Sequence, residues 1–128
     1  MLQVYKRGAN IKLTKNFSTS EFDCNCRFDD CTYTLIEDLL VNKLQGLRDD
    51  LKQPLHITSG FRCQKHNSSI IDSSKRSQHL VGRAVDVKFP VFLERQKFID
   101  LCNKHFGFVL VYKKFVHLDI RRKKYFIS

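Results

Sequence analysis

The most regular hydrophobic pattern in the chain lies between Thr34 and Lys52 and has the spacing of an amphipathic helix. Its apolar positions recur every three or four residues: Leu35, Ile36, Leu39, Leu40, Leu44, Leu47 and Leu51. Residues at this spacing share one helix face. Thr34 followed by Glu37 matches a capping box, and Pro54 ends the segment. We therefore predict a helix over residues 34–52.

Elsewhere, hydrophobic and polar side chains alternate, as in half-buried strands. Four strands are predicted, over residues 55–59, 83–89, 108–112 and 116–120. Two more helical segments are predicted, over 63–71 and 92–105. Residues 1–20 have no strong period and are expected to form a weakly packed arm, and residues 72–78 are polar and predict a loop. This order of elements indicates an α+β fold.

The polar faces of two predicted strands carry side chains suited to chemistry. In the strand 83–89, Asp86 lies on the face opposite Val85 and Val87. In the strand 116–120, His117 and Asp119 share a face. An imidazole and two carboxylates are therefore expected on polar faces of the sheet.

Composition narrows the class of protein. The chain has 128 residues, of which 42% are hydrophobic and 28% charged, so we expect one globular domain over 1–128. Disordered and collagen-like classes are excluded. No apolar run reaches the length of about eighteen residues that a membrane span needs. The N-terminus also lacks the pattern of a secretory signal, so we expect synthesis in the cytoplasm without a signal peptide.

Charge points to an anionic partner. The formal net charge is +10, and residues 51–128 hold 16 Lys and Arg against 5 Asp and Glu. Such a field favours nucleic acid, anionic lipid or acidic polymers of a bacterial envelope. Nucleic acid is disfavoured because the basic residues follow no recognisable reading helix or aromatic strand platform. The run 121–124 is expected to be a solvated tail, with a dedicated contact to a polyanion as the alternative.

His79, Asp86 and His117 form a candidate metal site. A hydrolytic zinc centre uses three protein ligands and leaves one position open for water. These residues come from a polar loop and two strands, and their nitrogen and oxygen donors suit zinc in a hydrolase. Histidines and aspartates are common, so the spacing alone is also consistent with surface or hydrogen-bonded core residues.

Three sequence blocks give this set a context. They read Ser59-Gly60-Phe61-Arg62, then Ser77-Gln78-His79-Leu80-Val81-Gly82-Arg83-Ala84-Val85-Asp86, then Val116-His117-Leu118-Asp119. In this order they resemble the zinc D-Ala-D-Ala carboxypeptidase family, over about residues 13–122. Its relatives include vancomycin-resistance dipeptidases, phage L-alanoyl-D-glutamate endolysins and the hedgehog signalling domain. The resemblance implies a small antiparallel sheet flanked by helices, with zinc on the sheet.

The resemblance also implies residue roles. His79, Asp86 and His117 would be the zinc ligands, and Arg62 would hold a substrate oxygen through its planar, permanently charged guanidinium. Ser77 would bind substrate or cap its loop. Gly82 would meet a backbone requirement.

One family feature is missing. In the dipeptidase and endolysin branches, an acid three residues before the last histidine acts as general base, and Lys114 stands there in this chain. Asp119 is then the candidate base, or a partner that orients a ligand imidazole. Tyr112 and His105 are further candidates, and Tyr112 would also lie near substrate.

The five cysteines indicate a second, structural role. Cys24, Cys26 and Cys31 cluster in the sequence and could join Cys63 in a closed zinc site, with His66 as a substitute ligand. Buried or free thiols are the alternative, and one disulfide could form outside the cell.

Together with the residues above, the resemblance implies a monomeric zinc metallopeptidase that cleaves amide bonds in peptidoglycan stem peptides at the bacterial cell wall after release. Its activity would be that of a D-Ala-D-Ala carboxypeptidase or of an endolysin-like endopeptidase. The basic half would help it dock on anionic wall polymers. The alternative is a zinc-containing binding module without turnover, which the missing acid favours.

Overall fold

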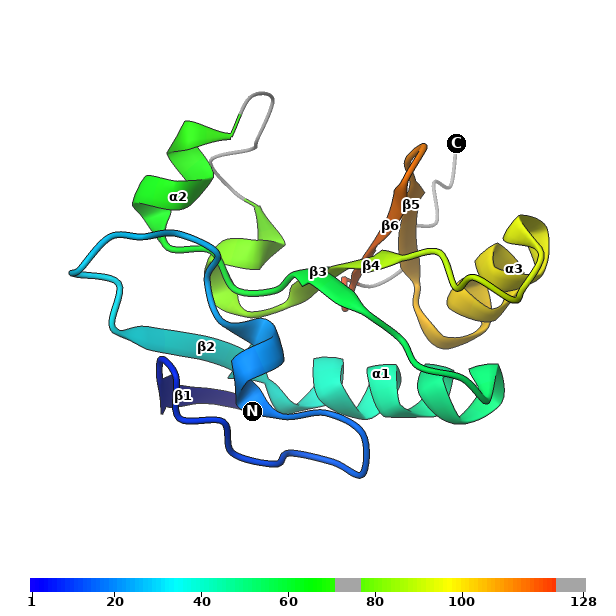
Figure 1. Cartoon of the computed structure of the whole chain (residues 1–128), viewed down its shortest axis with the longest axis horizontal. Helices are drawn as coiled ribbons and strands as arrows, with labels where there is room; N and C mark the ends of the chain where they lie inside the picture. Colours follow the sequence, from blue (N-terminus) through cyan, green and yellow to red (C-terminus); the bar gives the residue numbers. More distant parts are fainter. Residues whose placement is uncertain (71–76, 122–128) are drawn as a thin grey trace, which may run out of the picture.

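A four-stranded antiparallel sheet and three helices make up most of the molecule (Figure 1). The structure is a computed structural model, and it describes residues 1–70 and 77–121. The sheet has the order β3-β4-β6-β5, with bounds Ile57–Ser59, Ala84–Lys88, Phe115–Asp119 and Phe108–Val111. The helices are α1 (Asp38–Leu51), α2 (Gln64–Ser69) and α3 (Arg95–His105). The predicted α+β class and the antiparallel sheet flanked by helices are thus confirmed.

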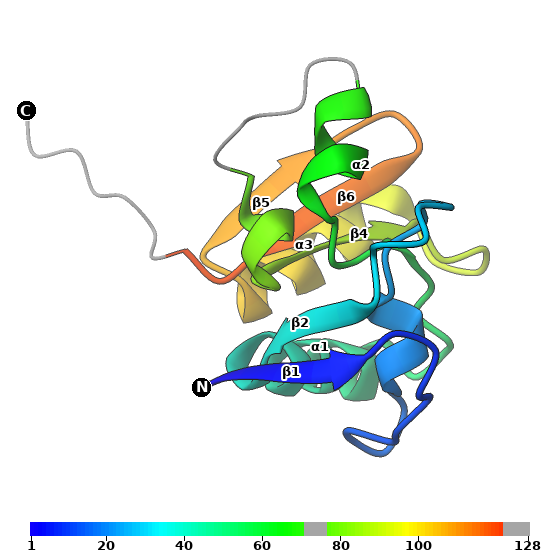
Figure 2. The same cartoon turned by 90° about the vertical axis from the view of Figure 1, so that its left-hand side faces the viewer.

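One face of the sheet packs on α1 and α3 and forms the main core. Val85 and Val87 of β4 and Val116 and Leu118 of β6 are fully buried there, together with Phe98 of α3. Helix α2 stands on the other side of β3 and β4 from α1 (Figures 1 and 2). The side chains that alternate with these core residues therefore face away from α1 and α3.

The predicted start of the first helix was wrong. Residues Tyr33–Glu37 form strand β2, and α1 begins only at Asp38. Thr34 does not cap a helix: it is buried, and its hydroxyl donates to the Asp23 carboxylate. Residues 33–37 form a strand because they pair with a segment distant in sequence. A local capping pattern contains no information about that pairing.

That distant segment corrects a second prediction. Leu2–Lys6 form strand β1, which pairs antiparallel with β2, so the N-terminal residues are not a loose arm. Phe17 is buried in the main core, and Thr19–Phe22 form a short 3-10 helix, η1. Strand β1 lacked a clear period because only its alternate residues are half-buried.

The bounds of other helices and strands also differ from the predicted ones by a few residues. Helix α3 starts at Arg95, and the preceding Phe92 is 90% exposed. Strand β6 spans Phe115–Asp119, one residue earlier than predicted, and Tyr112 N–H donates to the Phe115 carbonyl across the turn. Of the predicted loop 72–78 only Ser77 and Gln78 are described, and of the basic run 121–124 only Arg121. No helix in the two described ranges is long and apolar enough to cross a membrane.

Candidate metal centre and active site

His79 is held rigidly in a buried position. It lies in the 3-10 helix η2 (Gln78–Val81), where its backbone N–H donates to the Ser77 hydroxyl. Its ring Nδ1 lies 2.7 Å from the Gly60 carbonyl oxygen, so Nδ1 is the donor to that carbonyl and Nε2 is directed toward Asp86. The residue is 2% exposed, and among the described residues Nε2 is the one buried side-chain nitrogen or oxygen without a hydrogen-bond partner.

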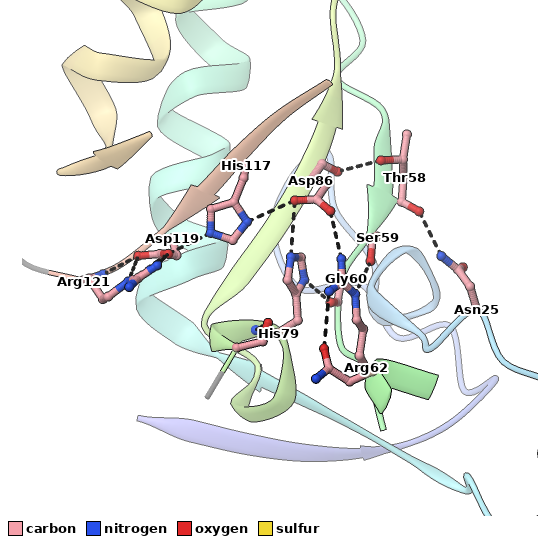
Figure 3. Close-up of polar contacts among 12 residues, drawn as sticks. Asn25, Thr58, Ser59, Gly60, Arg62, His79, Asp86, His117, Asp119 and Arg121 are labelled. Atoms are coloured by element: carbon pink, nitrogen blue, oxygen red, sulfur yellow. Dashed lines mark hydrogen bonds and ion pairs between the residues drawn. The ribbon is translucent and has the colours of Figure 1, made fainter. Parts of the chain in front are cut away.

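Asp86 and His117 complete a triangle with that nitrogen (Figure 3). The two residues pair directly across strands β4 and β6, which places both side chains on the face opposite the core. Asp86 Oδ1 lies 3.3 Å from His79 Nε2 and 3.1 Å from His117 Nδ1. The structure therefore brings together the three side chains that the sequence singled out.

The triangle fits a tetrahedral zinc ion. Zinc–nitrogen and zinc–oxygen bonds of about 2.0–2.1 Å put neighbouring ligand atoms about 3.3 Å apart. The distances from Asp86 Oδ1 match this value, and the three donor atoms all lie within 4.8 Å of one another. Nε2 of His79 is buried without a hydrogen-bond partner, and a metal ion shared with the Asp86 carboxylate would provide one.

Asp119 lies behind His117. Its Oδ2 is 2.8 Å from His117 Nε2, so the ring presents Nδ1 to Asp86 and Nε2 to Asp119. Asp119 is fully buried, and the Arg121 guanidinium donates to both of its oxygens. The two carboxylates together fix the orientation of the His117 ring.

The electrostatics of the site hold both carboxylates ionised. Burial raises the pKa of the Asp86 carboxyl, but the His117 and His79 imidazoles outweigh it and bring the pKa to about 2. Burial likewise raises the pKa of Asp119, which His117 and Arg121 bring to about 2. For His117, burial lowers the pKa, but Asp119 and Asp86 overcome this and the net pKa is raised.

Arg62 contacts the proposed ligand Asp86 instead of standing free in a pocket. Its Nη2 lies 3.1 Å from Asp86 Oδ2, while Nε donates to the Ser59 hydroxyl and Nη1 to the Asn67 side chain. The side chain is mostly buried. Arg62 therefore orients Asp86 so that Oδ1 faces the two imidazoles (Figure 3).

Gly82 has the backbone requirement that the family pattern implied. Its φ is +71°, and a Cβ there would lie 2.3 Å from the Leu35 carbonyl oxygen. The glycine lets the turn after His79 pass close to β2, where the Glu37 N–H donates to the Gly82 carbonyl.

The other predicted residues occupy varied places. Ser77 is the N-cap of η2. Tyr112 is exposed and stacks on Phe115, two residues before His117 on β6. His105 lies at the end of α3 and pairs with Asp50. Lys114 is exposed in the turn between β5 and β6.

The cysteines divide into two groups. Cys24, Cys26, Cys31 and Cys63 converge, with their four sulfurs within 4.8 Å of one another. Cys102 is buried in the main core. His66 provides its backbone N–H, which donates to the Cys63 sulfur.

The contact of Arg121 with Asp119 was not predicted from the sequence. Arg121 was expected to begin a solvated tail, yet its guanidinium donates to the Asp119 carboxylate and lies 3.7 Å from the centre of the Phe108 ring. A signal was present, because His117, Asp119 and Arg121 follow one another at the two-residue spacing of one strand face.

One of the comparisons with known proteins identifies the family of the chain. The comparisons with curated proteins and with solved structures give no match. A sequence model of the family described as Peptidase M15 matches residues 15–119, which include all three blocks and the His79, Asp86 and His117 triangle. The chain therefore belongs to the M15 family of peptidases, which are metallopeptidases.

Proposed function

We propose that the protein is a zinc-dependent metallopeptidase that hydrolyses amide bonds in peptidoglycan stem peptides. His79, Asp86 and His117 would hold the metal. The observation that carries the proposal is the buried, unpartnered Nε2 of His79, at tetrahedral-edge distance from a carboxylate that also meets His117. Membership of the M15 family supports both the chemistry and the substrate class.

Each proposed ligand has a partner that fixes its orientation. The Gly60 carbonyl holds His79, Arg62 holds Asp86, and Asp119 holds His117. Partners of this kind hold ligands in the geometry that a metal requires, so little reorganisation accompanies binding. When bound, zinc would supply Lewis acidity toward the amide carbonyl and lower the pKa of water toward neutrality.

Arg62 is also the candidate for contact with substrate. Three protein groups use three of its five N–H donors, and Asp86 places the guanidinium beside the proposed metal centre. A permanently charged fork here would stabilise negative charge that develops on a substrate oxygen. Arg62 would thus both orient Asp86 and bind substrate.

Two residues are proposed to contact the peptide. Ser77 adjoins the His79 turn, and Tyr112 stacks on Phe115, whose side chain shares a strand face with His117. We place Tyr112 at the edge of the substrate path because it is exposed on this face. The basic second half of the chain would attract anionic wall polymers.

Asp119 is assigned as a positioning residue and not as the general base. It is fully buried on the far side of the His117 ring from Asp86, and Arg121 occupies its oxygens. A base must reach the attacking water, and the His117 ring lies between Asp119 and the proposed centre.

The same facts favour one alternative function. With Asp119 engaged and Lys114 exposed in the position of the family acid, the chain could bind stem peptides through zinc without cleaving them. This alternative keeps the metal site and removes turnover.

One experiment separates the two functions. The protein is incubated with purified peptidoglycan as isolated, after chelation, and after zinc is restored, and the released fragments are identified by mass. The proposed peptidase releases stem-peptide fragments in the first and third samples only, and His117→Ala releases none. If the zinc-saturated, folded protein binds peptidoglycan but releases nothing, the binding module is correct.

A further inference from the structure

We propose that Cys24, Cys26, Cys31 and Cys63 hold a second, structural zinc ion that fastens the loop 23–32 to the segment carrying Arg62. The proposal of the metal site does not depend on the proposed function. It rests on the sulfur positions, on the N–H groups directed at them, and on the absence of regular structure in the loop 23–32.

The four sulfurs have the spacing of a zinc tetrathiolate. Zinc–sulfur bonds of about 2.3 Å put the corners of a tetrahedron about 3.8 Å apart. Cys63 Sγ lies 3.8 Å from Cys24 Sγ and 3.8 Å from Cys26 Sγ, and all four sulfurs lie within 4.8 Å of one another. A disulfide would need two sulfurs about 2.05 Å apart, and it would leave the other two thiols unused.

Hydrogen-bond donors already point at these sulfurs. The Cys63 N–H donates to Cys24 Sγ, the His66 N–H to Cys63 Sγ and the Arg7 Nη1 to Cys26 Sγ, each at 3.4 Å. N–H groups directed at sulfur stabilise the thiolate, which is the form that binds metal. Three of the four proposed ligands therefore have the surroundings of a coordinated sulfur.

Arg7 offsets part of the charge of such a site. Zinc with four thiolates carries two negative charges, and the Arg7 guanidinium lies against the cluster. It also donates to the carbonyl oxygens of Cys24, Cys26 and Cys31. One cation thus joins strand β1 to every cysteine of the loop.

The apolar core contributes little to holding the loop 23–32 in place. Residues 23–32 lie between η1 and β2 and contain no helix or strand. Its buried side chains belong to a small cluster apart from the main core, in which Phe61 is the one large buried side chain. Short segments without regular structure and with little apolar burial are typically held by metals or disulfides.

The site adjoins the active-site framework. Cys63 directly follows Arg62 and caps α2, whose Asn67 accepts from Arg62. The Arg62 N–H in turn donates to the His79 carbonyl. A metal at Cys63 would therefore fix the chain from Gly60, which holds His79, to Asn67.

The first test counts metal in the intact protein. Elemental analysis after gel filtration is expected to give two zinc ions per chain in the wild type, one in His117→Ala and one in Cys24→Ser/Cys63→Ser. Cys102→Ala, which changes a buried cysteine outside the cluster, should keep both. One zinc in the wild type and none in His117→Ala would overturn the proposal, as would iron in place of zinc.

The second test does not rely on variants that must fold. A mercurial reagent titrated into native wild type should release one zinc ion to a chromophoric indicator as the clustered thiols react, and the other should remain. Cobalt bound to His117→Ala should show the sulfur-to-metal charge-transfer band of a tetrathiolate. Release of no zinc, or a mass lower by two hydrogens per disulfide in the unreduced protein, would overturn the assignment.

A third measurement tests the fastening itself. Hydrogen exchange at residues 60–67 is expected to quicken when the mercurial removes the second zinc, while exchange in α1 stays slow. Unchanged exchange at 60–67 would refute the link to the Arg62 segment. Failure of peptidoglycan cleavage with two zinc ions bound would count against the proposed function only.

Discussion

At the scale of single residues, the site is a set of oriented pairs. His79, Asp86 and His117 each contact one group that fixes the orientation of the side chain. For His79 and Asp86 this group lies in a segment distant in sequence, and for His117 it lies two residues further along the same strand. Because orientation and coordination are separate tasks, substitutions of the partners and of the proposed ligands have different expected effects.

Asp119 provides the first prediction. Asp119→Asn keeps the shape of the side chain but removes the charge that holds His117, so zinc affinity should fall about ten- to a hundredfold, and added zinc should restore activity. Zinc titration with a competing chelator measures the affinity. If affinity is unchanged while turnover at saturating zinc drops by about two to four decades, Asp119 is the base after all.

Arg62 provides the second prediction. Arg62→Lys keeps the charge but loses the planar fork that joins Ser59, Asn67 and Asp86, so turnover should fall at least about tenfold at saturating zinc. Arg83→Lys is the matched control, because Arg83 is more exposed and its ion pair with Glu37 is 3.9 Å long. Equal losses of turnover in the two variants would argue against a special role for Arg62.

At the scale of elements, close contacts between turns and strands set the position of the ligands. Gly82→Ala should destabilise the fold by more than about 3 kcal/mol, because a positive φ and an overlap with the Leu35 backbone act together. Gly8→Ala is the control: its φ is +83° but a Cβ meets nothing within 4 Å, so a loss of about 1 kcal/mol is expected. Urea denaturation compares them, and similar losses would contradict the overlap.

The helices α1 and α3 are joined by a charged contact with a defined pH dependence. Lys104 and then His105 lower the pKa of the Asp50 carboxyl below its usual value. Such a group stabilises the fold above its unfolded pKa, near 3.8, and this stability is lost as pH falls through the lower folded pKa. Asp50→Asn should therefore be less stable than wild type at pH 6, and the difference should shrink toward pH 3. A difference that persists in acid would indicate a packing effect.

At the scale of the whole molecule, net charge should govern the proposed attachment to anionic wall polymers. A protein of charge +10 is drawn to anionic polymers, and added salt shortens the range of that attraction from about 10 Å at 0.1 M to about 3 Å at 1 M. The fraction that sediments with purified walls should fall over this range, equally in wild type and His117→Ala. Binding insensitive to salt would assign attachment to contacts other than net charge.

Much of the site was readable from the sequence because its information is local. The spacing between His79 and Asp86 and the two-residue period of the strand with His117 and Asp119 are properties of short segments. The helix α3 and all four strands of the sheet β3-β4-β6-β5 were found for the same reason. Hydrophobic periodicity of this kind reflects burial of one face, whatever the partner is.

Other features depended on pairing between distant segments. Thr34 and Glu37 matched a capping box, yet pairing with β1 made their segment a strand, because hydrogen bonds to a remote partner outweigh a local preference. The sequence also suggested Arg62 as a free substrate ligand, whereas the fold places Asp86 against it. Neither outcome is encoded in a window of neighbouring residues.

The sequence by itself determined the residue types, their order and the strand faces on which Asp86 and His117 lie, since these follow from side-chain chemistry and from the period of a strand. The tertiary structure decided which atoms meet. The register of β4 against β6 sets Asp86 opposite His117, the Gly60 carbonyl selects the nitrogen that His79 presents, and the loop 23–32 brings three cysteines to Cys63. These contacts join segments that are far apart in the chain, and only the packing of the whole fold sets the distances between their atoms.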